Sequence, residues 1–231
     1  MTSKFTTIGW VQAAVTILIL LKSTSIWANE IYVTQAGDNL KLEVQQRSAD
    51  NYVSLNSTGG SNDITIRQGM HDDGTVDLDE TGGHEAYWTV TGDNNNVESY
   101  QTDTNRGGGG GDHHHLANIV NGDSNNVSHT QMGKAGHTGF IEIQGDSNNV
   151  SLLQRGNGGQ KTADIVLTGD GHSVASDQRG SGSANLELDL TNSGGSYSVQ
   201  TNQNTSTTHR SYSLTGSCAT LGGCSVTVTQ N

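Results

Sequence analysis

The sequence predicts an all-β fold, a β-solenoid of about eight strand-turn-strand rungs, and three observations support this prediction. An apolar residue followed four positions later by Gln occurs eight times along the 231-residue chain. Within each copy, inward and outward residues alternate, which is the period of a β-strand. The chain also has 31 Gly and no Pro; Gly in the turns tolerates positive φ, and the absence of Pro leaves the strand edges open to pairing.

Residues 1–28 differ in composition from the rest of the chain. Lys4 precedes the apolar run VQAAVTILILL at residues 11–21, which has the length of the hydrophobic region of a secretory signal peptide. We expect cleavage after Ala28, with residues 29–231 forming a single exported repeat domain. An uncleaved membrane anchor is the alternative, but the run is shorter than the ~20 residues that a membrane-spanning helix needs.

The predicted mature chain is strongly acidic. The full chain has a formal net charge of −12, and residues 1–28 contribute two Lys and no acidic residue. Removing them leaves a net charge of −14. Phosphate recognition needs clustered Lys and Arg, so no nucleic-acid partner is expected.

The repeated Gln residues define the rungs. Their spacings are 22, 33, 30, 23, 24, 25 and 27 residues, and the two longest spacings indicate loop insertions near residues 71–85 and 106–115. In four copies an Asn precedes the apolar residue by two positions, on the same face. The predicted ladder residues are Gln46, Gln68, Gln101, Gln131, Gln154, Gln178, Gln203, Gln230, Asn62, Asn95, Asn125 and Asn148.

A second strand is predicted before each copy, followed by a turn such as GDNNN or GDSNN. A two-stranded unit cannot bury its apolar face alone, so the units are expected to stack ~4.8 Å apart. Buried amides are costly unless bonded, and stacked Gln side chains can bond to one another. The repeated residues therefore point inward. These second strands are expected at residues 31–35, 51–56, 86–91, 116–121, 139–144, 163–168, 185–190 and 210–215.

The segments NNVSHTQMG (125–133) and NNVSLLQRG (148–156) follow the frame N-x-V-x-x-x-Q-x-G. This frame resembles the curlin repeat of bacterial curli fibres. The resemblance implies export to the cell surface, self-assembly into amyloid-like fibres, and roles in adhesion and the biofilm matrix. Its implied partners are further copies, other curlin-like subunits and an outer-membrane secretion apparatus. The aliphatic second strand departs from the curlin pattern, so a minor or nucleating subunit is also considered.

The alternative function is a monomeric secreted solenoid, capped at its ends, that acts as an adhesive or calcium-binding module. Cys218 and Cys224 flank the segment ATLGG in the last rung. In an exported chain these two residues are expected to form a disulfide. Such a bond could cap the C-terminal end.

Two groups of polar residues are candidate metal ligands. Asp93, Asp123, Asp146 and Asp170 follow Gly at the same turn of successive rungs. Stacked carboxylates could bind Ca²⁺, but the G-G-x-G-x-D repeat of calcium-binding solenoids is absent, and we prefer to interpret them as turn residues. The run at residues 113–115, HHH, follows five Gly and is predicted to lie in a solvated loop rather than to form a metal clip.

No catalytic constellation stands out. Solenoid lyases and hydrolases need paired carboxylates or a basic cluster at a groove, whereas the acidic residues here are spread over regularly spaced turns. Thr-x-Thr occurs at residues 89–91 and 227–229 without recurring through the rungs, so ice binding is not expected. We therefore predict a non-enzymatic structural protein with no metal or cofactor.

Overall fold

The computed structural model describes residues 16–22, 30–36, 41–47, 51–69, 83–102, 113–190, 195–206, 208–216 and 223–230. Over these residues the chain forms seventeen β-strands. This described part has no helix of the length and apolarity needed to cross a membrane.

The strands form two parallel sheets, with odd-numbered strands in one and even-numbered strands in the other. The nine-stranded sheet contains β1 (Thr16–Lys22), β3 (Lys41–Arg47), β5 (Asp63–Gln68), β7 (Asn96–Thr102), β9 (Asn126–Met132), β11 (Asn149–Arg155), β13 (Ser173–Gly180), β15 (Tyr197–Thr205) and β17 (Cys224–Gln230). The eight-stranded sheet contains β2 (Glu30–Ala36), β4 (Tyr52–Thr58), β6 (Glu85–Thr91), β8 (His115–Asn121), β10 (Thr138–Gln144), β12 (Lys161–Asp164), β14 (Ala184–Glu187) and β16 (Arg210–Ser213).

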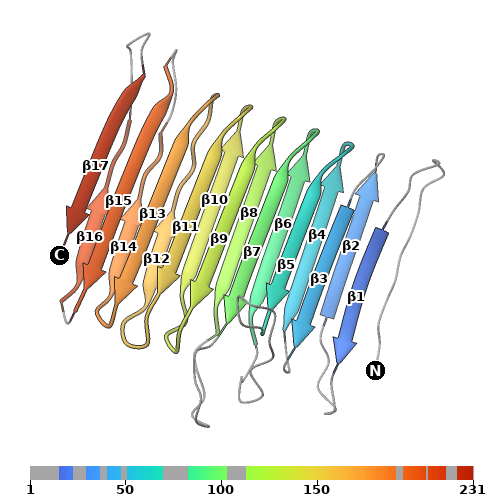
Figure 1. Cartoon of the computed structure of the whole chain (residues 1–231), viewed down its shortest axis with the longest axis horizontal. Helices are drawn as coiled ribbons and strands as arrows, with labels where there is room; N and C mark the ends of the chain where they lie inside the picture. The colour runs from blue at the N-terminus through green and yellow to red at the C-terminus, as the bar shows by residue number, and fades with distance from the viewer. Residues whose placement is uncertain are drawn as a thin grey trace.

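Each even-numbered strand and the odd-numbered strand that follows it make one rung, from β2/β3 to β16/β17. Figure 1 shows these rungs following one another along the long axis, with the blue and red ends of the chain at opposite extremes. The predicted β-solenoid of eight rungs is therefore confirmed.

The repeat frame sets the register of the stack. Between β9 and β11, Val127 pairs with Val150 and Gln131 pairs with Gln154. The next pairing continues both columns. Equivalent residues of successive rungs thus lie beside each other, because a shift by one residue would turn every apolar side chain outward.

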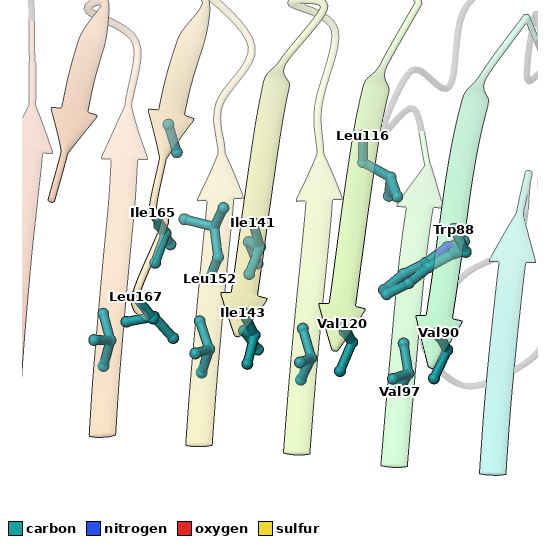
Figure 2. Close-up of a cluster of buried hydrophobic side chains, with 14 of the residues drawn as sticks. Trp88, Val90, Val97, Leu116, Val120, Ile141, Ile143, Leu152, Ile165 and Leu167 are labelled. Atoms are coloured by element: carbon teal, nitrogen blue, oxygen red, sulfur yellow. The ribbon is translucent and has the colours of Figure 1, made fainter. Parts of the chain in front are cut away.

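The core lies between the two sheets and consists of the inward aliphatic residues. Along β11, Val150, Leu152 and Gln154 are buried, while Ser151 is exposed. Figure 2 shows Trp88 and Val90 of β6 with Leu152 of β11 and the aliphatic side chains of other rungs in one continuous cluster. Each fully buried aliphatic side chain contributes ~1.5–3 kcal/mol.

Three strands of the eight-stranded sheet are shorter than predicted. The prediction of a strand at residues 163–168 is wrong beyond Asp164, because Val166, Leu167 and Thr168 have φ values of +22°, +137° and +57° and leave the extended conformation. Ile165 and Leu167 are nevertheless buried. Strands β14 and β16 likewise end at Glu187 and Ser213, before the predicted residues 190 and 215.

Two predicted boundaries also differ. The predicted loop insertions near residues 71–85 and 106–115 extend one residue too far, because Glu85 begins β6 and His115 begins β8. Within the segment predicted as a signal peptide, β1 pairs in parallel with β3. Cleavage after Ala28 stays a prediction.

Candidate functional site

The eight predicted Gln residues form one continuous glutamine ladder along the core. In every step the Nε2 of one Gln donates to the Oε1 of the Gln in the next rung, over 2.8–3.0 Å. The donors all point the same way along the chain, so the ladder is directional. It runs through Gln46, Gln68, Gln101, Gln131, Gln154, Gln178, Gln203 and Gln230.

From Gln68 to Gln230, the second hydrogen of each ladder amide joins the two sheets. Gln154 Nε2 also donates to the backbone carbonyl of Thr138 in the opposite sheet at 3.0 Å. Gln101, Gln178 and Gln203 make the equivalent bond to the opposite sheet. Since both amide hydrogens find acceptors, the desolvation cost of the buried amide is offset. This geometry explains why Gln rather than an aliphatic residue occupies the position.

The four predicted Asn residues form a column of a different kind. The backbone N–H of Asn125 donates to Oδ1 of Asn95 at 2.9 Å, and Asn125 Nδ2 donates to the carbonyl of Gly145 at 2.8 Å. Asn62, Asn95 and Asn148 repeat this arrangement. The inward Asn side chains therefore bond to the backbone of neighbouring turns and not to each other.

An Asn side-chain ladder exists on the outer face, where the sequence analysis did not expect one. Asn96 Nδ2 donates to Oδ1 of Asn126 at 2.8 Å, and Asn126 Nδ2 donates to Oδ1 of Asn149 at 2.9 Å. These amides are exposed. They are identical residues in register on β7, β9 and β11, which is the signal that could have found them.

Sequence reasoning also missed a buried histidine column, formed by His84, His114 and His137. Each residue immediately precedes a strand of the eight-stranded sheet. The imidazole rings stack, with centroids 4.9 Å apart for His84 and His114 and 5.0 Å apart for His114 and His137. The spacings of 30 and 23 residues match the ladder spacings of the same rungs, and this is the signal that could have revealed the column.

Hydrogen bonds define the protonation state of this column. The backbone N–H of His137 donates to Nδ1 of His114 at 3.1 Å, and that of Lys161 donates to Nδ1 of His137 at 3.2 Å. Each Nδ1 is therefore an acceptor, which leaves Nε2 as the protonated nitrogen, facing the carbonyls of Thr102 and Met132 at 3.1 Å. Only neutral imidazoles can make both bonds.

Burial disfavours the charged form of these rings. Burial, together with the neighbouring His84 and His137, lowers the pKa of His114 well below its usual value. Burial is also the main cause that lowers the pKa of His137 to about 4, with a contribution from Lys161. His114 and His137 are therefore neutral at pH 7.

His172 occupies the place of the ladder Asn in its own rung. Its backbone N–H donates to Asn148 Oδ1 at 2.8 Å, its Nδ1 accepts the backbone N–H of Tyr197 at 3.0 Å, and its Nε2 is 3.2 Å from the carbonyl of Thr168. The imidazole thus replaces both functions of an Asn amide.

Lys161 continues the histidine column in the sixth rung. Its Nζ donates to the carbonyls of Gly159 and Gly180, both at 2.9 Å, and to that of Gly182. The side chain is buried, and burial lowers its pKa to about 8. Glycine carbonyls, rather than a carboxylate, hold this cation.

The prediction that the run 113–115 lies wholly in a solvated loop is wrong for two of its residues. His114 is buried in the histidine column, and His115 begins β8, with Nε2 3.8 Å from Glu85. A strand begins within this low-complexity run, so its composition conceals two structural residues. His113 is exposed.

The turn aspartates bond to the backbone of the preceding rung. Asp123 Oδ1 accepts the backbone N–H of Asp93 at 2.7 Å, and Asp146 Oδ1 accepts that of Asp123 at 2.7 Å. Asp93 and Asp170 accept equivalent bonds. The described part of the chain contains no group of three or more His, Cys, Asp or Glu residues placed to hold a metal ion.

At the C-terminal end, Cys224 is disulfide-bonded. Cys218, its predicted partner, lies outside the described residues. In the register of β15 and β17, Tyr197 pairs with Cys224, so the column of inward Asn residues does not continue into the last two rungs.

Searches against protein-family models, curated proteins and solved structures each returned no match to this chain.

Proposed function

We propose that the chain is a structural subunit that stacks head to tail into curli-like, amyloid-type fibres. The observation that carries this proposal is the direction of the glutamine ladder. Gln46, in the first rung, has a buried Oε1 with no hydrogen-bond partner among the described residues. At the other end of the ladder, no further rung follows Gln230 among the described residues. Its Nε2 donates to the Ser211 carbonyl of the opposite sheet, but there is no next Gln to accept its other hydrogen.

A second copy would satisfy both ends at once. If β17 of one copy lies beside β3 of the next, the Nε2 of Gln230 meets the Oε1 of Gln46 in the same donor-to-acceptor sense as the seven internal steps. Both sheets are parallel throughout, so β16 would extend onto β2 of the same neighbour. Unpaired strand edges are templates for such addition.

The apolar residues at the ends support the same packing. Ile31 and Val33 in the first rung, and Leu214 and Val226 in the last rung, pack against the core but are only partly buried. Their counterparts in the middle rungs are fully buried. Stacking a second copy would cover these residues, and burial of apolar surface favours association.

Strand β1 occupies the edge of β3 at which a second copy would add. It covers the edge of β3, and its register places Leu21 opposite Gln46. We propose that export removes residues 1–28 and thereby exposes the edge of β3 for a second copy.

The setting of the proposed fibre follows from the same features. We propose an extracellular location at the cell surface, reached through an outer-membrane secretion apparatus, and roles in adhesion and the biofilm matrix. Other curlin-like subunits are proposed partners, with this chain as a minor or nucleating subunit. The role is structural rather than catalytic, and the acidic net charge of the chain disfavours nucleic acid.

The test is to dilute residues 29–231 from denaturant and follow thioflavin T fluorescence and electron microscopy. Seeded fibres with a cross-β spacing are expected. Gln46→Leu should slow elongation by ~2–10-fold, because it removes one hydrogen bond at the growing end. Gln45→Leu is the matched control, since its side chain lies outside the ladder. A soluble, monodisperse β-rich monomer at high concentration would support the monomeric alternative and overturn the proposal.

A further inference from the structure

Three tyrosines lie side by side on the outer face of the eight-stranded sheet, and we call them the tyrosine strip. They are Tyr32 on β2, Tyr52 on β4 and Tyr87 on β6. The ring centroids are 5.6 Å apart for Tyr32 and Tyr52 and 5.2 Å apart for Tyr52 and Tyr87. Tyr52 is therefore the central member and contacts both neighbours.

The two outer members of the strip are accessible to solvent, and Tyr52 between them is half-buried. Tyr32 and Tyr87 are 44% and 37% exposed and are the two exposed large hydrophobic residues of the described chain. The remaining three tyrosines of the sequence do not belong to an exposed strip. Tyr100 and Tyr197 are buried, and Tyr212 packs against the core.

Carboxylates accompany the strip. The sequence E-x-Y occurs at residues 30–32 and 85–87, and the parallel register places Glu30, Tyr52 and Glu85 in one row across three strands. The hydroxyl of Tyr32 donates to Oε2 of Glu30 at 3.0 Å. Oxidation of a phenol releases a proton as well as an electron, and a hydrogen-bonded carboxylate is a ready acceptor for that proton.

We propose that the tyrosine strip is a site of oxidative cross-linking, at which a haem peroxidase with hydrogen peroxide joins Tyr52 to Tyr32 or to Tyr87. Each phenol loses one electron and one proton to give a tyrosyl radical. Two radicals couple through the ring carbons next to their hydroxyl groups, and the hydrogen on each of these carbons moves to the oxygen. One carbon–carbon bond forms, and hydrogen peroxide takes up the two electrons and two protons to give two molecules of water.

The strand register makes this coupling selective. Neighbouring strands hold the rings within contact distance before oxidation, so a radical on Tyr52 has a partner in the same molecule. Each product would join two of the first three rungs covalently near the N-terminal end, whereas a disulfide involves Cys224 at the C-terminal end. This proposal depends on the strand pairing within one chain and not on fibre formation.

The experiment treats the folded full chain, dilute enough to remain monomeric, with haem peroxidase and hydrogen peroxide. Dityrosine fluorescence is measured on the monomer band, and linked peptides are identified by mass spectrometry. The expected links are Tyr32–Tyr52 and Tyr52–Tyr87. Tyr52→Phe should lose most of the monomer fluorescence, whereas the matched control Tyr212→Phe should retain it.

Two further measurements keep the result decisive. Tyr32→Phe and Tyr87→Phe should each abolish one linked peptide and retain the other, which a general loss of folding would not produce. In urea the selectivity among the six tyrosines should disappear. The proposal is overturned if Tyr52→Phe forms as much intramolecular dityrosine as the parent chain, or if the parent links only different molecules.

Discussion

The middle and the C-terminal rungs share one backbone arrangement but differ in their polar columns. In the rungs from β6 to β11, the glutamine ladder, the inward Asn residues and the histidine column all run in register. In the last two rungs the histidine column gives way to Ala184 and Arg210, and the Asn position is taken by Tyr197 and Cys224.

Burial changes along with these columns. The inward residues of β8 are fully buried, whereas Val226 and Val228 of β17 are only partly buried. Parallel backbone pairing and the glutamine ladder therefore suffice to place a rung, since both continue to Gln230. The inward Asn and His columns add bonds to the turns on either side. In the last two rungs, which lack both columns, the strands β14 and β16 of the eight-stranded sheet have only four residues each.

The largest expected effect is the loss of a middle ladder amide. Gln131→Leu removes the acceptor of Gln101 Nε2 and the donor to Gln154 Oε1, both buried. With ~1–3 kcal/mol for each buried group left unpaired, unfolding should require ~2–5 kcal/mol less free energy. Urea denaturation measures this. Gln230→Leu removes the part-buried bond from Gln203 and the exposed bond to the Ser211 carbonyl and should cost only ~1 kcal/mol, because the groups left behind can bond to water. Equal losses at both positions would remove the distinction between middle and end.

The histidine column should make the middle rungs acid-sensitive. The pKa of His137 is about 4 in the folded chain and ~6.5 when unfolded. The unfolded state therefore takes up the proton first, so the free energy of unfolding should be highest above pH ~6.5 and fall as the pH decreases towards 4, by up to ~3 kcal/mol. Melting curves between pH 7 and 4 measure the loss.

The matched variant for this prediction is His137→Asn. An Asn amide can accept the backbone N–H of Lys161 and donate to the carbonyl of Met132, as the inward Asn residues do elsewhere, but it does not titrate. The variant should lose part of the pH dependence. His114, which faces His137, and the buried His129 also have pKa values lowered by burial, so the remaining slope reports on them. Lys161, with a pKa of about 8, stays protonated over this range. An unchanged pH profile would contradict a role for His137.

Two turn glycines, both with positive φ, differ in how closely the next rung approaches them. Gly122 has φ of +127°, and a Cβ there would collide with the carbonyl of Gly145. Gly171 has φ of +70°, but a Cβ there would lie 3.7 Å from Ser196, at an ordinary contact distance. The left-handed conformation alone costs ~1–2 kcal/mol. Gly122→Ala should therefore lower the melting temperature clearly more than Gly171→Ala does. Equal shifts would mean that the turns are not held against each other.

The smallest expected effect concerns the exposed asparagines. Asn126→Ala interrupts the outer ladder between Asn96 and Asn149, but the groups left behind can bond to water. The expected loss is ~0.5 kcal/mol or less. If Asn126→Ala lowered the free energy of unfolding in urea as much as Gln131→Leu does, solvent exposure would not determine how much a ladder contributes to stability.

The sequence predicted the fold and the ladder residues because both follow from a period. Alternation and the recurring Gln determine which side chains face inward and which align. The partners of the inward Asn residues could not be predicted, since they are backbone groups of turns in neighbouring rungs. The Lys161 site was equally hidden, because its ligands are glycine carbonyls. The early end of β12 leaves no trace in the sequence, because Ile165 and Leu167 keep the apolar alternation after the backbone has left the strand.

The most direct test of the central claim is cryo-electron microscopy of fibres grown from residues 29–231. Head-to-tail stacking of eight rungs predicts an axial subunit repeat of ~38 Å, from rungs ~4.8 Å apart, with β17 beside β3 and β16 beside β2 of the next copy. A junction between two identical ends, or the absence of fibres under conditions where the chain is folded, would contradict the claim that the glutamine ladder continues from one molecule to the next.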